Sequence, residues 1–442
     1  MFLKIKKISK QWRNPIVHDV SFLYIIHFFN YFLPILIIPF LTRILGAQGW
    51  GLIAFTLAFA QYVTVIVEYG FHLSATREAA RHRDNKAILS KLFSSVLSAK
   101  ILIAALFFLL SLTFYKHIPI FKENPILFKA GVFLAISQAL NVSWFFRGIN
   151  KLKVASLLEI GAKALGIISA YFIIKTPSDG WKFIMVNGVF YIVFFIIGLI
   201  LIYRFIPIYP LRFSTTLETL KLGWNTFLIY SSGTIYTSGN VFILGFIASP
   251  EIVGLYSSVE KISRIFANLL DPVRVSIFPH LSYLIFHNQT KAIIVIRSTI
   301  IIMSIIGLSL GIIAYFTSDF LVSTILGPDF IPAVPTLKVL APLPLFMILS
   351  NLFAVQWLLP QGIEKPVVKI ILAIFSLNII LALILVPKFH QLGMGITVVS
   401  GEFFLVISLW IYMVKNKLNP FSRKKLSKTI LVKDFNEPKL EI

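Results

Sequence analysis

Apolar residues along this chain form twelve stretches of about 20 residues, separated by short polar segments. A run of ~20 mostly apolar residues is long enough to cross the hydrocarbon core of a bilayer as a helix. The pattern therefore predicts an all-α integral membrane protein with twelve transmembrane helices. We expect these spans at residues 20–41, 50–67, 92–114, 126–146, 154–174, 183–203, 224–248, 253–279, 293–316, 339–359, 367–386 and 394–414.

The two halves of the chain repeat each other. Residues 137–144 (Ser-Gln-Ala-Leu-Asn-Val-Ser-Trp) recur at 350–357 as Ser-Asn-Leu-Phe-Ala-Val-Gln-Trp. Gly51 matches Gly254, and the same offset places the acid Glu68 on the acid Asp271. Six spans per half is an even number, so the two repeats are parallel and related by an axis along the membrane normal. A cavity between such halves is where a transported solute would sit, which favours a transporter.

The repeat and the loops predict how the chain is organised. We expect a basic N-terminus (1–19), a six-helix bundle (20–205), a linker (206–223), a second six-helix bundle (224–414) and a basic tail (415–442). Lys and Arg gather in alternate loops, which predicts that both termini and the linker are cytoplasmic. Residues 1–19 lack the pattern of a removable signal peptide, so we expect the first span to act as the targeting signal.

Composition removes several classes of function. Hydrophobic residues make up 57% of the 442 residues and charged residues only 13%, against roughly 25% in soluble domains. The net charge is +23, and the basic residues that produce it flank the spans. Membrane topology and anionic lipids account for this arrangement, so we expect no nucleic-acid partner. The chain has no cysteine, no loop longer than about two dozen residues, and no constellation of acid, base or nucleophile. We therefore expect neither an enzyme nor a protein with a metal or other cofactor.

Charged side chains inside the spans are the candidate functional residues, because a charge at mid-bilayer costs ~2.5–3.5 kcal/mol and calls for a wet cavity or a partner. In the eighth span, spacings of three or four predict one polar helix face, with a kink at Pro272. Its members are Lys261, Arg264, Asn268, Asp271 and Arg274.

Other spans carry isolated charges. Glu159 and Lys163 lie four apart in the fifth span and form either a functional pair or an internal ion pair. Lys100 lies close enough to the end of its span to snorkel toward lipid head groups, as does Arg297. Glu402 has no basic neighbour on its own helix turn and is a candidate proton site.

The seventh span offers neutral polar groups. Tyr236 and Asn240 share a face with Ser232, and such groups suit sugar recognition or hydrogen bonding between helices. Basic and hydroxylated side chains together indicate an anionic, sugar-bearing solute.

Several local motifs resemble those of a known family. Residues 68–80 (Glu-Tyr-Gly-Phe-His-Leu-Ser-Ala-Thr-Arg-Glu-Ala-Ala) resemble the loop after the second helix in polysaccharide-biosynthesis flippases of the Wzx type, which belong to the MOP superfamily. Further matches at 144–148, 253–257 and 326–330 extend the resemblance over nearly the whole chain. The family often has an acid where this chain has Asn150.

The resemblance implies two six-helix bundles around a V-shaped cavity, as in MATE transporters, and O-antigen translocation in lipopolysaccharide biosynthesis. The implied substrate is an undecaprenyl-pyrophosphate-linked oligosaccharide, moved by alternating access across the cell inner membrane. Implied partners are a polysaccharide polymerase and a chain-length regulator. The residues expected to contact the substrate are Lys261, Arg264, Arg274, Lys163, Lys100, Arg147, Tyr236 and Asn240, and those expected to couple transport to an ion are Asp271, Glu68, Glu159 and Glu402.

Two alternatives stay open. One is a cation-coupled multidrug or small-solute exporter of the same superfamily, which an acidic and aromatic cavity would favour. The other is an integral-membrane polysaccharide polymerase or glycosyltransferase, which a large extracytoplasmic loop would favour.

Overall fold

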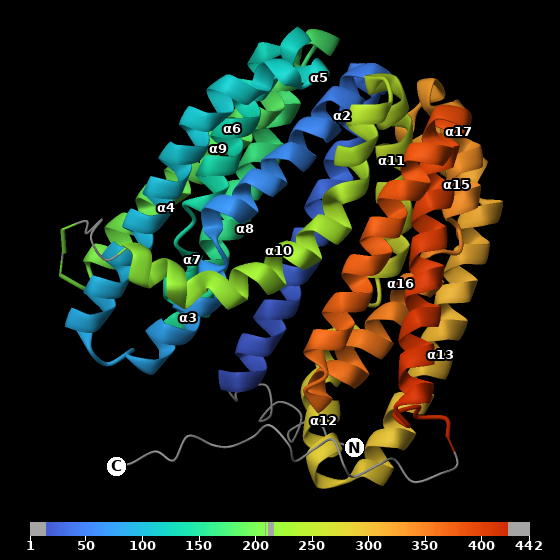
Figure 1. Ribbon diagram of the computed structural model, residues 1–442. Coiled ribbons are helices and arrows are strands. Elements are labelled where there is room, and N and C mark those ends of the chain that lie inside the picture. Colours follow the sequence, from blue (N-terminus) through green and yellow to red (C-terminus); the bar gives the residue numbers. More distant parts are fainter. Residues whose placement is uncertain (1–14, 208, 211–215, 423–442) are drawn as a thin grey trace, which may run out of the picture. The chain divides into compact units, whose positions relative to one another are not determined.

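The computed structural model describes residues 15–207, 209–210 and 216–422, and within these ranges every regular element is a helix (Figure 1). The prediction of an all-α membrane protein is confirmed. Eight helical segments of the described chain are long and apolar enough to cross a membrane by length and composition. The expected basic N-terminus, up to residue 14, and the expected tail, from residue 423, lie outside the described residues.

The helices of the first half follow the predicted spans. α2 is interrupted at Gly46, whose φ of 65° and ψ of −178° are not helical and suit glycine, so this element consists of two helices that match two predicted spans. The fourth span is divided into α6 and α7 by a break at residues 140–142. The elements are α2 (Pro15–Glu68), α3 (Phe71–Arg81), α4 (Lys86–Phe114), α5 (Pro119–Glu123), α6 (Pro125–Ala139), α7 (Ser143–Gly148), α8 (Leu152–Ile173), α9 (Gly180–Tyr203) and α10 (Thr216–Ile247).

The second half repeats some of these irregularities. α17 is interrupted at His390 (φ 51°, ψ −129°) and consists of two helices that match the last two predicted spans. α16 is followed by a π-helical turn at Leu352–Leu358, where the repeated motif has its second copy. The elements are α11 (Pro250–Asn268), α12 (Asp271–His287), α13 (Gln289–Phe316), α14 (Ser318–Leu321), α15 (Val334–Leu340), α16 (Leu343–Asn351) and α17 (Glu364–Lys415). The count of twelve membrane crossings stays a prediction.

The eighth predicted span is not one helix. α11 ends at Asn268 and α12 begins at Asp271, so the polar residues expected on one helix face belong to two helices. Pro272 stands in the first turn of α12, where a proline fits because the first turn has no backbone partner for its missing N–H. The expected kink is therefore a complete break in the helix.

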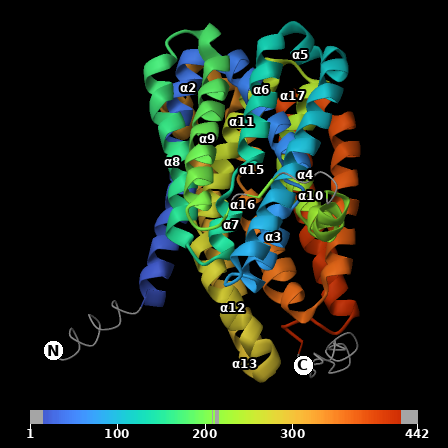
Figure 2. The ribbon, with the colours of Figure 1, turned by 90° about the vertical axis from the view of Figure 1, so that its left-hand side faces the viewer.

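The described chain forms two compact units. The first contains the described residues up to Ser258 together with Val322–Pro332, and the second contains Val259–Leu321 and the described residues from Ala333 onward. In the first unit, α2, α6, α8 and α9 pack side by side, and α10 packs against α2, α3 and α4 (Figures 1 and 2). Arg43 ties Val322–Pro332 to α2 by donating a hydrogen bond to the carbonyl of Thr324. The bundle boundaries at 205 and 224 stay a prediction.

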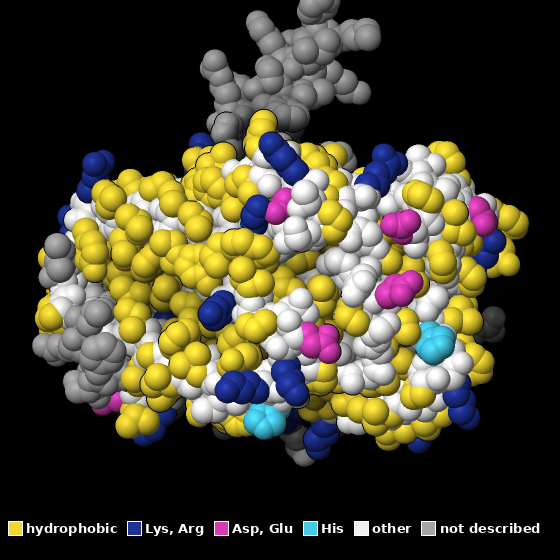
Figure 3. Space-filling model, turned by 90° about the horizontal axis from the view of Figure 1, so that it is seen from above, with side chains coloured by type: hydrophobic (Ala, Val, Ile, Leu, Met, Phe, Trp, Pro, Cys, Tyr) yellow, Lys and Arg dark blue, Asp and Glu magenta, His cyan; other side chains and the backbone are white. Residues whose placement is uncertain are grey.

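Acidic and basic side chains are mixed on the molecular face that Figure 3 shows. Lys and Arg lie singly among Asp, Glu and large apolar areas there, and no continuous basic patch is visible (Figure 3). One acid–base pair of the second unit joins a short loop helix to α15, with Lys338 Nζ 2.8 Å from Asp319 Oδ2. This hydrogen bond from Lys338 lowers the pKa of the Asp319 carboxyl.

Within the first unit, two glycines that repeat each other in sequence face each other. A Cβ on Gly51 would overlap the carbonyl oxygen of Pro250, and a Cβ on Gly254 would overlap that of Ala47. The backbones of α2 and α11 therefore touch directly, as small residues allow in membrane helices. We expect Gly51→Ala to lower the free energy of unfolding by about 1–3 kcal/mol, because neither backbone has a side chain that could move aside.

Thermal unfolding of the purified protein in detergent measures this effect. Gly49→Ala is the matched control, since a Cβ there would meet only the Cβ of Leu45 at 3.0 Å and the next atom at 3.9 Å. Equal unfolding temperatures for the two variants would contradict the packing described here.

Candidate functional site

A polar cavity of about 310 Å³ lies inside the first unit. Four of the residues predicted to be functional line it together: Glu68, Arg147, Glu159 and Lys163. They come from α2 and from the consecutive helices α7 and α8, which follow much later in the sequence. The other lining side chains are also polar, namely Gln61, Thr64, His72, Gln138, Asn141, Ser143 and Tyr191.

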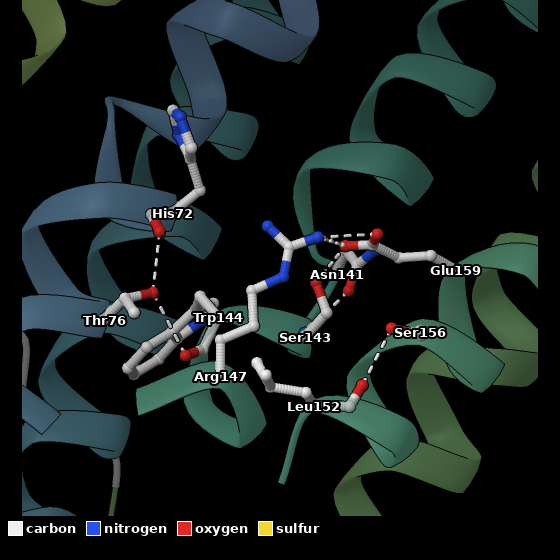
Figure 4. A network of polar contacts seen from close by, with 9 residues as sticks. All are labelled: His72, Thr76, Asn141, Ser143, Trp144, Arg147, Leu152, Ser156 and Glu159. Atoms are coloured by element: carbon white, nitrogen blue, oxygen red, sulfur yellow. Dashed lines mark hydrogen bonds and ion pairs between the residues drawn. The ribbon is translucent and has the colours of Figure 1, made fainter. Parts of the chain in front are cut away.

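The break between α6 and α7 positions the residues on one side of this cavity. Asn141 Oδ1 accepts a hydrogen bond from the backbone N–H of Ser143 at 2.7 Å, which starts the short helix α7. α7 carries Arg147 on its last turn. Thr76 donates hydrogen bonds to the carbonyls of His72 and Trp144, at 2.6 and 3.1 Å, and so fastens α7 to α3 (Figure 4). The side chains are thus held by helices rather than by loose loops.

Arg147 and Glu159 form the central ion pair of the cavity. Arg147 Nη2 donates to both carboxylate oxygens of Glu159 at 2.7 Å, and the hydroxyl of Ser143 donates to Oε1 at 2.5 Å (Figure 4). The Arg147 side chain is 41% exposed and that of Glu159 is 18% exposed. The pair therefore faces open space, and the guanidinium keeps other N–H donors for a ligand.

Glu159 has hydrogen-bonding partners beyond its own helix, in addition to the nearby Lys163 that the sequence predicted. Glu159 has its hydrogen bonds with Arg147 and Ser143 on α7, whereas Lys163 lines the same cavity one helical turn further along α8. Lys163 still feels the charge of Glu159 electrostatically. The spacing of four residues predicted that Glu159 and Lys163 lie close together, but it did not indicate the contact of Glu159 with α7.

A second acid, Glu68, ends α2 at the edge of the cavity. The chain turns sharply after it, through Tyr69 and Gly70, both with positive φ, and α3 then brings His72 back toward the acid. His72 Nδ1 lies 3.6 Å from Glu68 Oε2. His72 was not among the residues that the sequence predicted to be functional, and the structure places it in the cavity. Its spacing of four residues from Glu68 was the available signal.

Lys100 has a different position from the one expected. It does not snorkel to the lipid surface but is 1% exposed, and its Nζ donates to the carbonyls of Ala139 at 2.7 Å and Asn141 at 3.3 Å. Those carbonyls belong to the break between α6 and α7. Lys100 is thus a cap for the interrupted helix, and its ammonium group has two protein acceptors. Arg297, by contrast, lies at the end of the second unit and donates to the carbonyls of Pro420 and Ser422.

The predicted cations of the second unit have acidic partners on their own helices. Arg264 donates to Glu260 Oε1 from Nε at 3.0 Å and from Nη2 at 2.9 Å. Arg274 pairs with Asp271. Lys261 lies between Glu260 and the end of α11 and is electrostatically coupled to Glu260. These residues belong to two helices rather than to the one polar helix face that the sequence predicted.

The remaining predicted residues are spread over two helices. Glu402, on α17, is 7% exposed and accepts a hydrogen bond from Ser350 at 3.0 Å. Asn240, on α10, is 4% exposed. The side chain of Tyr236 lies outside the described residues. Among the described residues, no group of three or more His, Asp and Glu is placed to hold a metal ion.

Comparison with known proteins identifies the family. The model of the family described as "Polysaccharide biosynthesis protein" matches residues 16–285, more than half of the chain. The chain belongs to this family. Two proteins named "Putative O-antigen transporter" are similar to it along nearly their whole length. The one from Escherichia coli (strain K12) is 29% identical over 402 residues, covering 90% of this chain and 96% of that protein, and the one from Shigella dysenteriae is 27% identical over 397 residues, covering 88% and 98%.

Solved structures confirm the fold of this family member. The inward-facing conformation of a multidrug resistance MATE transporter of the MOP superfamily superimposes with a TM-score of 0.65 at 15% identity, over 90% of this chain and 96% of that chain. The lipid II flippase MurJ, in an inward closed conformation, also gives 0.65 at 16% identity, over 89% and 87%. The fold is therefore that of the MOP superfamily, as the sequence motifs implied. Both curated relatives are named as transporters, in agreement with the expectation that the chain is not an enzyme.

Proposed function

We propose that this chain is a flippase that moves a lipid-linked oligosaccharide across a bacterial cytoplasmic membrane. Its family, the names of its relatives and its likeness to a lipid II flippase support a lipid-linked glycan as the substrate class. The observation that carries the proposal is the convergence of Arg147, Lys163, Glu68 and Glu159 on one polar cavity. We place both termini in the cytoplasm, on the basis of the charge asymmetry of the loops.

The chemistry of the substrate explains why only part of it needs a polar environment. A polyprenyl tail stays in the hydrocarbon phase throughout, so only the sugars and the pyrophosphate need a polar route. Arg147 is suited to the pyrophosphate because a guanidinium binds phosphate oxygens through two parallel N–H donors. Lys163 adds a second positive charge in the same cavity. The undecaprenyl pyrophosphate carrier is the specific substrate that we propose.

Charge balance suggests how binding is linked to transport. The positive charges of Arg147 and Lys163 are balanced in the cavity by the negative charges of Glu68 and Glu159. A pyrophosphate that replaces Glu159 as the partner of Arg147 therefore leaves the Glu159 carboxylate beside a second anion. Proton uptake by Glu159 or Glu68 removes this repulsion, which makes these two acids our main coupling candidates, ahead of Asp271 and Glu402.

The movement that we propose is alternating access, in which the site opens first to the cytoplasm and then to the outer side. An anion that leaves an inside-negative cell also moves downhill by ~2.3 kcal/mol per charge per 100 mV. Transport can be measured in reconstituted vesicles with an imposed pH gradient. A transport rate that does not depend on this gradient would contradict proton coupling and leave the membrane potential as the driving force.

Mass spectrometry of lipid-linked intermediates tests the function directly. A strain that lacks this chain is expected to accumulate completed oligosaccharide units on their polyprenyl carrier, inaccessible to sugar-modifying enzymes added outside the spheroplasts. Loss of a polymerase would instead leave single units that are accessible from outside. Unchanged amounts of lipid-linked units would contradict the proposed function.

A further inference from the structure

The second unit contains a cavity of its own, of about 270 Å³, between α12 and the π-helical turn after α16. Its walls are Asp271, Arg274 and Phe278 from α12, and Asn351, Val355 and Gln356 from the end of α16 and the π-helical turn. Of the residues that line this cavity, the function proposed above uses only Asp271, as a secondary coupling candidate.

This cavity is the counterpart of the cavity in the first unit. The internal repeat aligns Asp271 with Glu68, Asn351 with Gln138 and Gln356 with Ser143, and all six residues line their respective cavities. In both halves the cavity also lies beside an interrupted helix, at the break between α6 and α7 and at the π-helical turn. Irregular backbone in a membrane helix bundle is tolerated where it lines a cavity, and such places are often ligand sites.

The two cavities differ in their unmet hydrogen bonds. In the first, the Gln138 side-chain oxygen lies 3.3 Å from the Thr64 hydroxyl, and Ser143 donates to Glu159. In the second, Asn351 Oδ1 and Gln356 Oε1 are both buried and have no hydrogen-bond partner among the described residues. Gln356 as a whole is only 3% exposed. Buried amide oxygens without donors are unusual and call for a ligand that supplies them.

The charges around these oxygens decide what kind of ligand fits. Asp271 and Arg274 form an ion pair, so the wall carries no net charge from this pair and offers no excess for either an anion or a cation. The unmatched groups are the two acceptor oxygens of Asn351 and Gln356, in a lining that also contains Phe278. Donor-rich neutral groups such as sugar hydroxyls and acetamido N–H groups match this arrangement. The volume lies just below the ~300 Å³ of the smallest common ligand pockets, so it suits part of a ligand.

We propose that this second cavity is a sugar subsite, in which the Asn351 and Gln356 side chains accept hydrogen bonds from a neutral sugar of the transported glycan. The inference rests on the proposed function, since the sugar arrives on the same lipid. It separates the tasks of the two related cavities: the first binds the charged head group, and the second recognises the uncharged sugar.

Binding of two lipids to the purified full-length protein tests this division. The probes are undecaprenyl pyrophosphate and the same lipid bearing one N-acetylglucosamine. We expect Gln356→Met to weaken binding of the glycosylated lipid about tenfold and to leave binding of the bare pyrophosphate unchanged, because only the sugar has lost an acceptor. Gln289→Met, at the start of α13 and outside the cavity, is the matched control, and Asn351→Leu is expected to repeat the effect of Gln356→Met.

The possible outcomes are distinguishable. Wild-type protein that binds neither lipid would contradict the proposed function and the inference with it. If the wild-type protein binds both lipids, two results for Gln356→Met would overturn the sugar subsite alone. The variant could bind both lipids as tightly as the wild type, or it could bind both equally weakly. A further outcome would also overturn it. If sodium chloride stabilises the wild type more than choline chloride does, and Gln356→Met abolishes this difference, the cavity is a cation site.

A labelling experiment gives an independent readout. The sequence contains no cysteine, so Val355→Cys introduces the only thiol of the chain, inside the second cavity. We expect the glycosylated lipid to slow modification of this thiol by a small methanethiosulfonate at least fivefold, and the bare pyrophosphate to leave the rate unchanged, since one hydrogen-bonded ring is enough to cover the site. Equal rates with both lipids would contradict the subsite.

Discussion

Arg147→Gln is expected to reduce export of the lipid-linked glycan by about 10- to 100-fold, because hydrogen bonds to a charged group contribute ~1.5–3 kcal/mol and each 1.4 kcal/mol is tenfold. Complementation of a flippase-null strain measures the loss. Thermal unfolding should change little, since a partly exposed ion pair is worth ~1 kcal/mol or less. Arg204→Gln, exposed beyond the end of α9, is the matched control and should export normally.

The double variant Arg147→Gln, Glu159→Gln separates two roles of this arginine. If Arg147 only neutralises Glu159, removing both charges restores export. If Arg147 binds the pyrophosphate, the double variant stays inactive. Restored export would therefore remove Arg147 from the substrate site, although both residues line the cavity.

Lys100→Met is expected to destabilise the protein by about 3 kcal/mol or more, since it removes two charge-assisted hydrogen bonds and leaves two carbonyls at the α6–α7 break without these donors. Methionine has a similar length, so the loss reports on hydrogen bonding rather than on a large cavity. The unfolding temperature in detergent and the yield of folded protein should both fall.

Lys91→Met is the matched control for this variant. Lys91 lies on the same helix, α4, but is exposed, and its replacement should leave the unfolding temperature within a degree or two. If Lys100→Met were as stable as the control and yet inactive, the ammonium group would serve the substrate rather than the helix break.

The positions of the helices could be predicted from the sequence because bilayer thickness sets the length of each apolar run. The interruptions at Gly46 and His390 fall between predicted spans, as expected. The repeated motif also marked a pair of corresponding helix interruptions, at 140–142 and Leu352–Leu358, although sequence similarity alone gave no indication of their form.

The site was harder to predict because its contacts join distant elements. Spacing along one helix placed Glu159 near Lys163, but it did not indicate that Ser143 and Arg147 on α7 also donate hydrogen bonds to Glu159. The eighth span appeared to be one polar helix face because nothing local indicated that the helix ends at Asn268. Snorkelling was expected for Lys100 because its acceptors, the carbonyls of Ala139 and Asn141, are some 40 residues away in sequence.

Direct contact between Gly51 and Gly254 has a consequence for how a duplicated chain can diverge. Two copies of one gene begin identical, so a mutation at this position before the duplication would have introduced two clashes at once, one for each copy. In the present chain each glycine lies against the backbone of the other helix, where a Cβ would overlap the carbonyl oxygen of Pro250 or Ala47. Such mutual constraint explains how a pair of residues can stay matched while the sequence around them drifts apart.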